Sequence, residues 1–318
     1  MIGRKPQIIT FGETMALFTP DQNHSIERAE KLQQGFGGAE SNVAIGLARL
    51  GVDVGWFSKL GEDPFASRIV KTIRGEGVDV SRVTYTDQAS TGMMLRELVC
   101  GKVAVHYFRK HSAASTMSVD DLDEEYIRSA QILHVTGITT ALSESCKQTI
   151  FRAVEIAKQA GVKISFDPNL RLKLWTLEEA REVILPLAEQ ADYFLPGWDE
   201  LKLLYNTTDA AVIDKKLHAL NGVSIVKGKG DSNVIYENGQ EVDVPFYPAE
   251  QVVDTVGAGD AFCAGFLAGI AKGLSPLEAV RIASVTGSIV VQTFGDWEAI
   301  PTWKDVERRL SAQVWIER

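Results

Sequence analysis

The sequence predicts an α/β fold, with a mainly parallel central sheet covered by helices on both faces and a small β-sheet lid. Two observations support this prediction. Along most of the chain, short apolar runs of strand length alternate with segments of helix length, an order that favours a parallel sheet buried between helices. Between Val83 and Phe108, short alternating segments are instead rich in β-branched and aromatic residues, which favours antiparallel strands.

The first third of the chain begins the alternation. The apolar run Ile8–Phe11 predicts a buried strand, and the glycines that open Gly35–Leu50 lead into a predicted amphipathic helix. Val52–Leu60 is typical of a strand and is closed by a glycine. Pro64–Gly75 predicts a second helix, because proline suits the first helical turn.

A hairpin then interrupts the alternation. Thr91–Leu98 and Val103–Phe108 flank the predicted turn Val99–Lys102. We expect this hairpin to belong to a small sheet over the carboxyl edge of the large one, where it would serve as a lid over a ligand. The predicted division is residues 18–35 and 83–111 for the lid, and residues 1–17, 36–82 and 112–318 for the main α/β domain.

After Asp120 the order of helix and strand resumes, and no internal repeat or linker is visible. The dipeptide Asn238-Gly239 is a strong signal for a two-residue hairpin turn. The predicted strands are Ile132–Val135, Val162–Phe166, Tyr193–Leu195, Ser224–Lys227, Val234–Tyr236 and Gln240–Val244, and the predicted helices are Ser143–Ala160, Leu177–Gln190, Asp260–Lys272 and Pro276–Val291.

Composition excludes several classes of protein. The 318 residues include 45% hydrophobic and 24% charged side chains, which is ordinary for a globular protein, and no apolar run approaches the ~20 residues of a membrane span. A net charge of −9 disfavours nucleic acid as a partner. The N-terminus lacks the apolar stretch of a signal peptide, so a cytoplasmic location is expected. Three cysteines without metal-ligand spacing predict free thiols.

The strongest motif is Asp254-Thr-Val-Gly-Ala-Gly-Asp260, which precedes a helix rich in small apolar residues. Gly257 and Gly259 allow the backbone to turn so that several N–H groups, including that of Ala258, point to one place. These N–H groups are expected to form an anion hole at the helix N-terminus. A carboxylate beside an anion hole suits phosphoryl transfer, with Asp260 accepting a proton from the attacking hydroxyl. The helix dipole is expected to keep Asp260 ionised. The alternative is that Asp260 only caps the helix.

The string Asp254–Phe262 resembles the C-terminal signature of the ribokinase-like (PfkB-type) carbohydrate kinases. Gly37–Asn42 is similar to the sugar-binding glycine motif of the same family, and the two motifs lie near opposite ends of the chain, as they do in the family. The resemblance covers essentially the whole chain. It implies a ribokinase-like fold, ATP and Mg²⁺ as cofactors, Asp260 as the catalytic base, the Gly257–Asp260 amides as the anion hole and a homo-oligomer formed through the lid. It leaves monovalent-cation dependence open.

Four segments resemble the family members that phosphorylate 2-keto-3-deoxygluconate at its 6-hydroxyl: Phe11–Met15, Gly37–Asn42, Tyr107–Ser115 and Phe166–Trp175. This sugar acid carries a carboxylate, which a guanidinium binds through a bidentate fork. Arg109 and Arg171 are the candidates, and Arg171 has the alternative of serving the ATP phosphates. The substrate contacts that the resemblance implies are Gly37, Gly38, Asn42, Tyr107, Arg109, Arg171, Asp260 and Asp296.

The resemblance implies that the glycine-rich turn after the strand at Ser224–Lys227 lies against the nucleotide, and the sequence itself indicates a lysine-bearing turn that suits a phosphate. A Walker A string is absent from the sequence, so a P-loop fold is not supported. The predicted nucleotide contacts are Asn169, Arg171, Lys227, Gly228, Gly230, Gly257 and Gly259.

The sequence departs from the family pattern at two places. Gly197 stands where many members have an asparagine, so Glu200 is expected to hold Mg²⁺ only through water. Met93 and Met94 stand where some relatives have a tyrosine that contacts the sugar, which keeps a fructokinase or another sugar kinase of the family open as an alternative. A second alternative is a sugar or nucleotide sensor without catalysis, because a fold does not determine a function.

Overall fold

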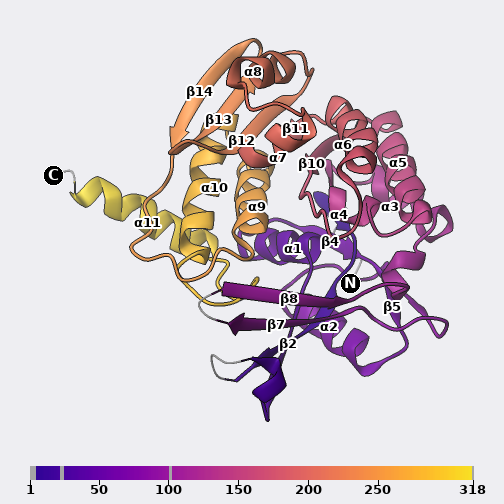
Figure 1. Ribbon diagram of the computed structural model, residues 1–318. Helices are drawn as coiled ribbons and strands as arrows, with labels where there is room; N and C mark the ends of the chain where they lie inside the picture. Colours follow the sequence, from indigo (N-terminus) through magenta and orange to yellow (C-terminus); the bar gives the residue numbers. More distant parts are fainter. Residues whose placement is uncertain (1–4, 22–24, 100–101, 317–318) are drawn as a thin grey trace.

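An eight-stranded sheet forms the centre of the protein in the computed structural model, which describes residues 5–21, 25–99 and 102–316 (Figure 1). The strand order is β14-β13-β12-β11-β10-β9-β1-β4. All neighbouring strands from β4 to β12 are parallel, and β13 and β14 extend the sheet as an antiparallel hairpin. The strands are β1 (Ile8–Phe11), β4 (Val54–Phe57), β9 (Ile132–Thr136), β10 (Lys163–Asp167), β11 (Tyr193–Phe194), β12 (Val223–Lys229), β13 (Ser232–Glu237) and β14 (Gln240–Pro245).

Helices cover both faces of this sheet (Figure 1). Consecutive strand residues point to opposite faces, so Ile8 packs into one core and Ile9 into the other. One face carries α1 (Ala39–Arg49), α2 (Pro64–Gly75), α9 (Ala258–Ala271) and α10 (Pro276–Val290). The other carries α3 (Glu124–Arg128), α5 (Glu144–Gln159), α6 (Leu177–Gln190), α7 (Trp198–Leu204) and α8 (Ala210–His218). The remaining helical segments are η1 (Ile26–Arg28), η2 (Ala113–Thr116), η3 (Val119–Asp121), α4 (Gly137–Thr140) and α11 (Trp303–Ile316).

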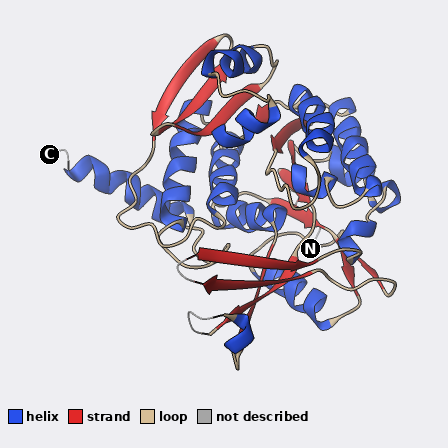
Figure 2. Cartoon of the chain, in the orientation of Figure 1, coloured by secondary structure: helices blue, strands red, loops and turns tan. Residues whose placement is uncertain are grey.

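A second, four-stranded sheet, called here the small sheet, has the order β3-β2-β7-β8 (Figure 2). Its strands are β2 (Met15–Pro20), β3 (Leu32–Gly37), β7 (Met93–Val99) and β8 (Lys102–Phe108). The predicted hairpin is confirmed in β7 and β8, while Cys100 and Gly101 of its turn lie outside the described residues. Two further strands, β5 (Lys59–Gly61) and β6 (Thr84–Thr86), pair with each other in a separate sheet.

Helix α9 is buried on all sides, which its uniformly small and apolar sequence requires. Two glycines allow its neighbour α10 to approach closely. A Cβ atom at Gly265 would lie 2.8 Å from the Cα atom of Ala283, and one at Gly269 would lie 2.8 Å from Ala279. This packing fixes the N-terminus of α9, which carries the Gly-Ala-Gly-Asp motif.

The fold agrees with the sequence prediction for the mainly parallel sheet, its two helical layers and the small sheet. The strand predicted over Val52–Leu60 is divided into β4 and β5, and β11 is shorter than expected. Cys146 and Cys263 are buried free thiols, as predicted. Among the described residues, no helix combines the length and apolar character needed to cross a membrane.

Candidate active site

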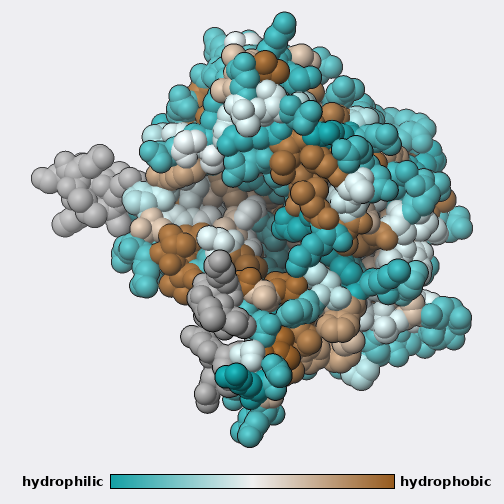
Figure 3. All heavy atoms as spheres, in the orientation of Figure 1, coloured by the Kyte–Doolittle hydropathy of each residue, from teal (hydrophilic) through white to brown (hydrophobic). Residues whose placement is uncertain are grey.

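A cavity of about 570 Å³ lies where the carboxyl ends of central strands face the small sheet. Figure 3 shows this face of the molecule, which is hollowed above β8. Parallel sheets bind ligands at this edge because the loops after the strands converge there. Predicted site residues that line the cavity are Gly37, Gly38, Asn42, Tyr107, Arg109, Asn169, Arg171, Glu200, Lys227, Gly257, Gly259, Asp260 and Asp296. Ala258, Gly228 and Gly230 are the predicted residues that do not line it.

The loop before α9 brings the N-terminus of this helix to the cavity. Gly257 caps the helix in the left-handed region, with φ of 76°, which glycine adopts without strain. Ala258 and Gly259 open the helix, and Asp260 lies in its first turn. The N–H of Ala258 donates to the Thr255 carbonyl at 3.4 Å, whereas Gly257, Gly259 and Asp260 line the cavity at the N-terminus of the helix, where an anion would be bound.

Asn42 joins the two acidic residues of the site. Its Nδ2 atom donates to Asp260 Oδ2 and to Asp296 Oδ1, at 2.8 Å in each case. Asn42 lies on α1, directly after the Gly37-Gly38 motif, whereas both acids lie near the C-terminal end of the chain. The predicted N-terminal and C-terminal motifs thus meet in one hydrogen-bonded group.

The ionisation expected for Asp260 is corrected by this arrangement. Burial, followed by the negative charge of Asp296, raises the pKa of Asp260 to about 8, although the hydrogen bond from Asn42 acts in the opposite direction. Burial and the charge of Glu298 raise the pKa of Asp296 to about 7, against the positive charge of Arg96. The helix dipole is outweighed because desolvation and a like charge act on the carboxyl group together.

Arg109 and Arg171 both reach the cavity, but their partners differ. Arg109 forms an ion pair with the buried Glu13, with 2.6 Å from its Nε to Glu13 Oε2, and Ser112 donates to the other oxygen of Glu13. One edge of the Arg109 guanidinium is therefore occupied. Among the described residues Arg171 has no ion-pair partner, and its Nη1 donates to the Leu170 carbonyl at 3.2 Å. Its charge acts to lower the pKa of Asp260.

A second ion pair also lines the cavity. Lys227 Nζ is 2.8 Å from Asp167 Oδ2, and the thiol of Cys263 donates to the same oxygen at 3.2 Å. Burial alone would lower the pKa of Lys227, but the carboxylate of Asp167 outweighs it and holds that pKa above its usual value. The sequence analysis named Lys227 without Asp167. The position of Asp167 at the end of β10, before Pro168-Asn169, was the signal available for it.

Glu200 lies near this pair and also caps a helix. Its carboxylate accepts hydrogen bonds from the backbone N–H groups of Leu170, at 2.6 Å, and Gly197, at 2.7 Å. Burial and the charge of Asp167 raise its pKa. Within the described part of the chain, no three His, Cys, Asp or Glu side chains are grouped so that they could hold a metal ion.

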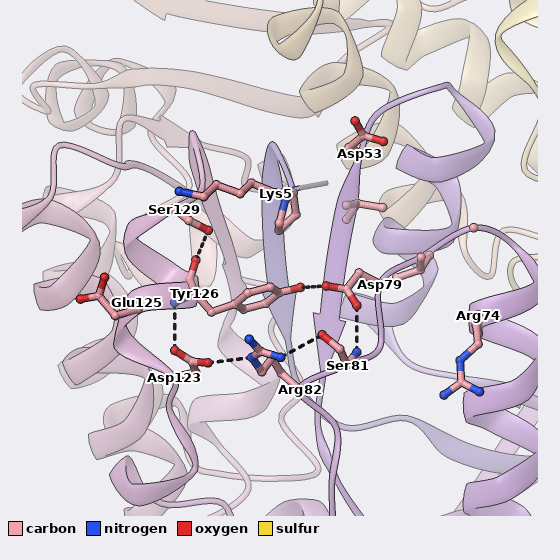
Figure 4. A pocket seen from close by; sticks show the side chains of 14 residues that line it. Lys5, Asp53, Arg74, Asp79, Ser81, Arg82, Asp123, Glu125, Tyr126 and Ser129 are labelled. Carbon is pink, nitrogen blue, oxygen red and sulfur yellow. Dashed lines mark hydrogen bonds and ion pairs between the residues drawn. The ribbon is translucent and has the colours of Figure 1, made fainter. Parts of the chain in front are cut away.

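A larger cavity, of about 1200 Å³, lies at the opposite edge of the sheet, before β1 and β4 (Figure 4). Its charged and polar groups largely bind each other. Tyr126 donates to Asp79 at 2.7 Å, and Arg82 Nε is 2.6 Å from Asp123. None of the predicted site residues lines it. The smaller cavity is therefore the candidate active site.

Comparison with known proteins finds matches over nearly the whole chain. The model of the pfkB family of carbohydrate kinases matches residues 5–303. The 2-dehydro-3-deoxygluconokinase of Bacillus subtilis is 40% identical over 316 residues, covering 97% of each chain. Fructokinase-1 of Oryza sativa is 33% identical, covering 96% of this chain and 98% of that protein. The crystal structure of a PfkB protein from Polaromonas sp. JS666 has a TM-score of 0.87 at 35% identity, covering 95% of this chain and 99% of that one.

The family match spans nearly the whole chain and includes both glycine motifs and every acidic residue of the candidate site. The structural match also extends over nearly the whole chain, with 95% of it aligned. The chain belongs to the pfkB family of carbohydrate kinases.

Proposed function

We propose that this carbohydrate kinase transfers the γ-phosphoryl group of ATP to the 6-hydroxyl of 2-keto-3-deoxygluconate. The observation that carries the proposal is the position of Asp260 beside the anion-hole loop, in a cavity that also holds Arg109 and Arg171. The 40% identity to a 2-dehydro-3-deoxygluconokinase supports the sugar acid as the substrate.

In this reaction the sugar oxygen forms a bond to the γ-phosphorus while the bond from that phosphorus to the bridging oxygen of ADP breaks. Asp260 orients the sugar hydroxyl and accepts its proton late, because a carboxylate is too weak a base to remove it outright. The backbone N–H groups of Gly257, Gly259 and Asp260 are assigned to the charge on the transferred group, and that of Ala258, which donates to the Thr255 carbonyl, supports the turn. Asp260 must be ionised to accept the proton. Because its pKa is raised, the ionised fraction, and with it the rate of transfer, depends on pH.

The carboxylate of the sugar acid requires a cation in the cavity. Glu13 holds Arg109 through one edge of the guanidinium and leaves its other N–H groups for a ligand. Arg171 supplies a second positive charge. We assign the remaining predicted substrate contacts to Gly37, Gly38, Asn42, Tyr107 and Asp296, and we propose that the small sheet is the lid that excludes water.

ATP is assigned to the side of the cavity lined by Asn169 and Lys227, and the turn with Gly228 and Gly230, which follows Lys227 outside that lining, is assigned to the part of the nucleotide that extends beyond the cavity. The residues of the cavity fit a magnesium ion that is bound through water molecules. Asp167 and Glu200 both line the cavity, and their oxygens already accept hydrogen bonds from protein groups. These two carboxylates would hold the ion through water. The bound ion would neutralise phosphate charge during the transfer.

A fructokinase activity is the second candidate, and the 33% identity to a plant fructokinase favours it. The test is ATP consumption by the purified protein with 2-keto-3-deoxygluconate, with fructose, with ribose and without sugar. Turnover with the sugar acid alone supports the proposal. Turnover with fructose alone overturns the substrate assignment and retains the role of Asp260. Binding of ATP without turnover on any sugar supports a sensor.

A further inference from the structure

Arg96 is a buried cation on the small sheet, and the proposed reaction gives it no role. It lies on β7, and its side chain is only 4% exposed. One of its terminal nitrogens, Nη2, makes a close ion pair with Oδ2 of Asp254, whose side chain is 3% exposed. Burying two charges is costly unless they pair well, so each of these residues depends on the other.

Asp254 opens the motif that forms the anion hole. Its second carboxylate oxygen, Oδ1, accepts the backbone N–H of Val256 at 3.1 Å, and its own N–H donates to the carbonyl of Val291 at 3.2 Å. The carboxylate therefore shapes the turn that leads directly into Gly257. Arg96 holds this carboxylate from the other side of the cavity.

The same guanidinium also reaches the loop that carries Asp296. Its Nη1 lies 3.4 Å from the carbonyl oxygen of Gly295, and its central carbon lies 4.4 Å from the centre of the Phe294 ring. A planar guanidinium can make these contacts at the same time, whereas the single ammonium of lysine cannot. Arg96 thus connects the small sheet to the loop that leads into Asp260 and to the loop that carries Asp296.

We propose that Arg96 is a positioning residue, which fixes the anion-hole loop and the Asp296 loop when the small sheet lies against the main domain. This inference rests on the proposed phosphoryl transfer at Asp260. If the small sheet moves away, Asp254 loses its cation and the turn before Gly257 loses its support. The geometry for transfer is then complete only when the cavity is covered. Water is excluded at that point, so it competes less with the sugar as the acceptor of the phosphoryl group.

The test is a double-mutant cycle with Arg96→Gln, Asp254→Asn and the double variant. Arg96→Gln is expected to lower kcat about 100-fold, the order of effect of a small misplacement in an active site, with the KM for ATP changed less than threefold. Asp254→Asn is expected to have a similar effect, and the double variant is expected to be little worse than either. Arg96→Lys should restore only part of kcat, because it keeps the charge without the fork.

Arg82→Gln is the matched control, since Arg82 also pairs with a carboxylate and lies over an aromatic ring, at the other edge of the sheet. Its kcat is expected to stay within twofold of the original protein. Thermal unfolding of every variant separates a loss of fold from a loss of positioning. If Arg96→Gln does not fold, Arg96→Lys takes its place in the cycle with Asp254→Asn, and kcat is again tested for additive losses.

An unchanged kcat in Arg96→Gln, or additive losses in the double variant, would overturn the inference. A rise in the KM for sugar with unchanged kcat would also overturn it, because Arg96 would then act in binding. The cycle is measured with whichever sugar of the panel the original protein phosphorylates best. A wrong substrate assignment therefore appears in the panel, and a wrong role for Arg96 appears in the cycle.

Discussion

Gly257 lies directly against the backbone of Asp296. A Cβ atom at position 257 would be 1.9 Å from the Asp296 carbonyl oxygen, far inside any real contact. The left-handed φ of 76° at Gly257 adds a second reason for glycine. The anion-hole loop and the loop of the second acid are therefore packed as one unit, and a side chain between them must separate them.

Gly257→Ala is expected to lower kcat by at least 100-fold, because the collision moves the amides away from the transferred group. The measurement is steady-state turnover together with thermal unfolding. Gly273→Ala is the matched control: Gly273 also has a positive φ, of 81°, but a Cβ atom there meets open space. This control carries the backbone strain without the collision. Equal losses of turnover in the two variants would contradict the argument.

Asp260→Asn is expected to lower kcat by about 10²- to 10⁴-fold, the range for loss of a general base. Asparagine has nearly the same shape, so the hydrogen bond between Asn42 and Asp296 should persist, and ATP binding measured by calorimetry should stay within a few-fold. Asp305→Asn, in the first turn of α11 and outside the lining of the cavity, is the control for removal of one acid. Unchanged turnover in Asp260→Asn would exclude the proposed base.

The sequence was sufficient for the features that short segments determine. The Asp254–Asp260 motif predicted a helix N-terminus, which the structure confirms, because glycine and capping requirements are local. The anion hole there, and the sugar contacts that the resemblance implies for Gly37–Asn42, stay predictions. The sequence did not pair Arg109 with Glu13 or Arg96 with Asp254, since these partners lie 96 and 158 residues apart.

The ionisation of Asp260 could not be predicted for a related reason. The helix dipole can be judged from neighbouring residues and favours the charged form. Burial and the charge of Asp296 arise only when α1, α9 and the loop after α10 come together, and they favour the protonated form. The pKa is therefore a property of the tertiary fold.

The pH dependence of turnover should reflect these two acids. Asp260 has a pKa of about 8 in the structure and must be ionised to accept a proton, so kcat/KM is expected to rise with pH between about 6 and 9 and then level off. Asp296→Asn removes the neighbouring negative charge. The pKa of Asp260 should then fall, and the midpoint of the rise should move to lower pH. A midpoint near 4 in the original protein would contradict the raised pKa.

The same pKa values predict the sign of a stability change. The folded-state pKa of each acid lies above the unfolded value of 3.8, so the protonated carboxyl group favours the folded state. This contribution to stability is fully present below pH 3.8 and is lost as pH rises through the folded-state pKa. From pH 5 to pH 9 the folded protein should therefore lose stability through Asp260 and Asp296. Asp260→Asn should raise the melting temperature more at pH 9 than at pH 5. Equal shifts at both values of pH would show that the carboxyl group is not strongly perturbed.

Arg109→Leu tests the recognition of the sugar acid. A hydrogen bond to a charged group contributes about 1.5–3 kcal/mol, so kcat/KM for 2-keto-3-deoxygluconate is expected to fall about 10- to 100-fold. Fructose has no carboxylate, so its kcat/KM should change less than threefold.

The Arg109→Leu substitution also leaves Glu13 buried without its cation, which lowers stability. The double variant Glu13→Gln/Arg109→Leu removes that charge while the carboxylate site stays lost. Selectivity for the sugar acid over fructose should therefore remain low in the double variant, even where its stability recovers. Equal losses of kcat/KM for both sugars in Arg109→Leu would instead show that Arg109 acts by supporting Glu13.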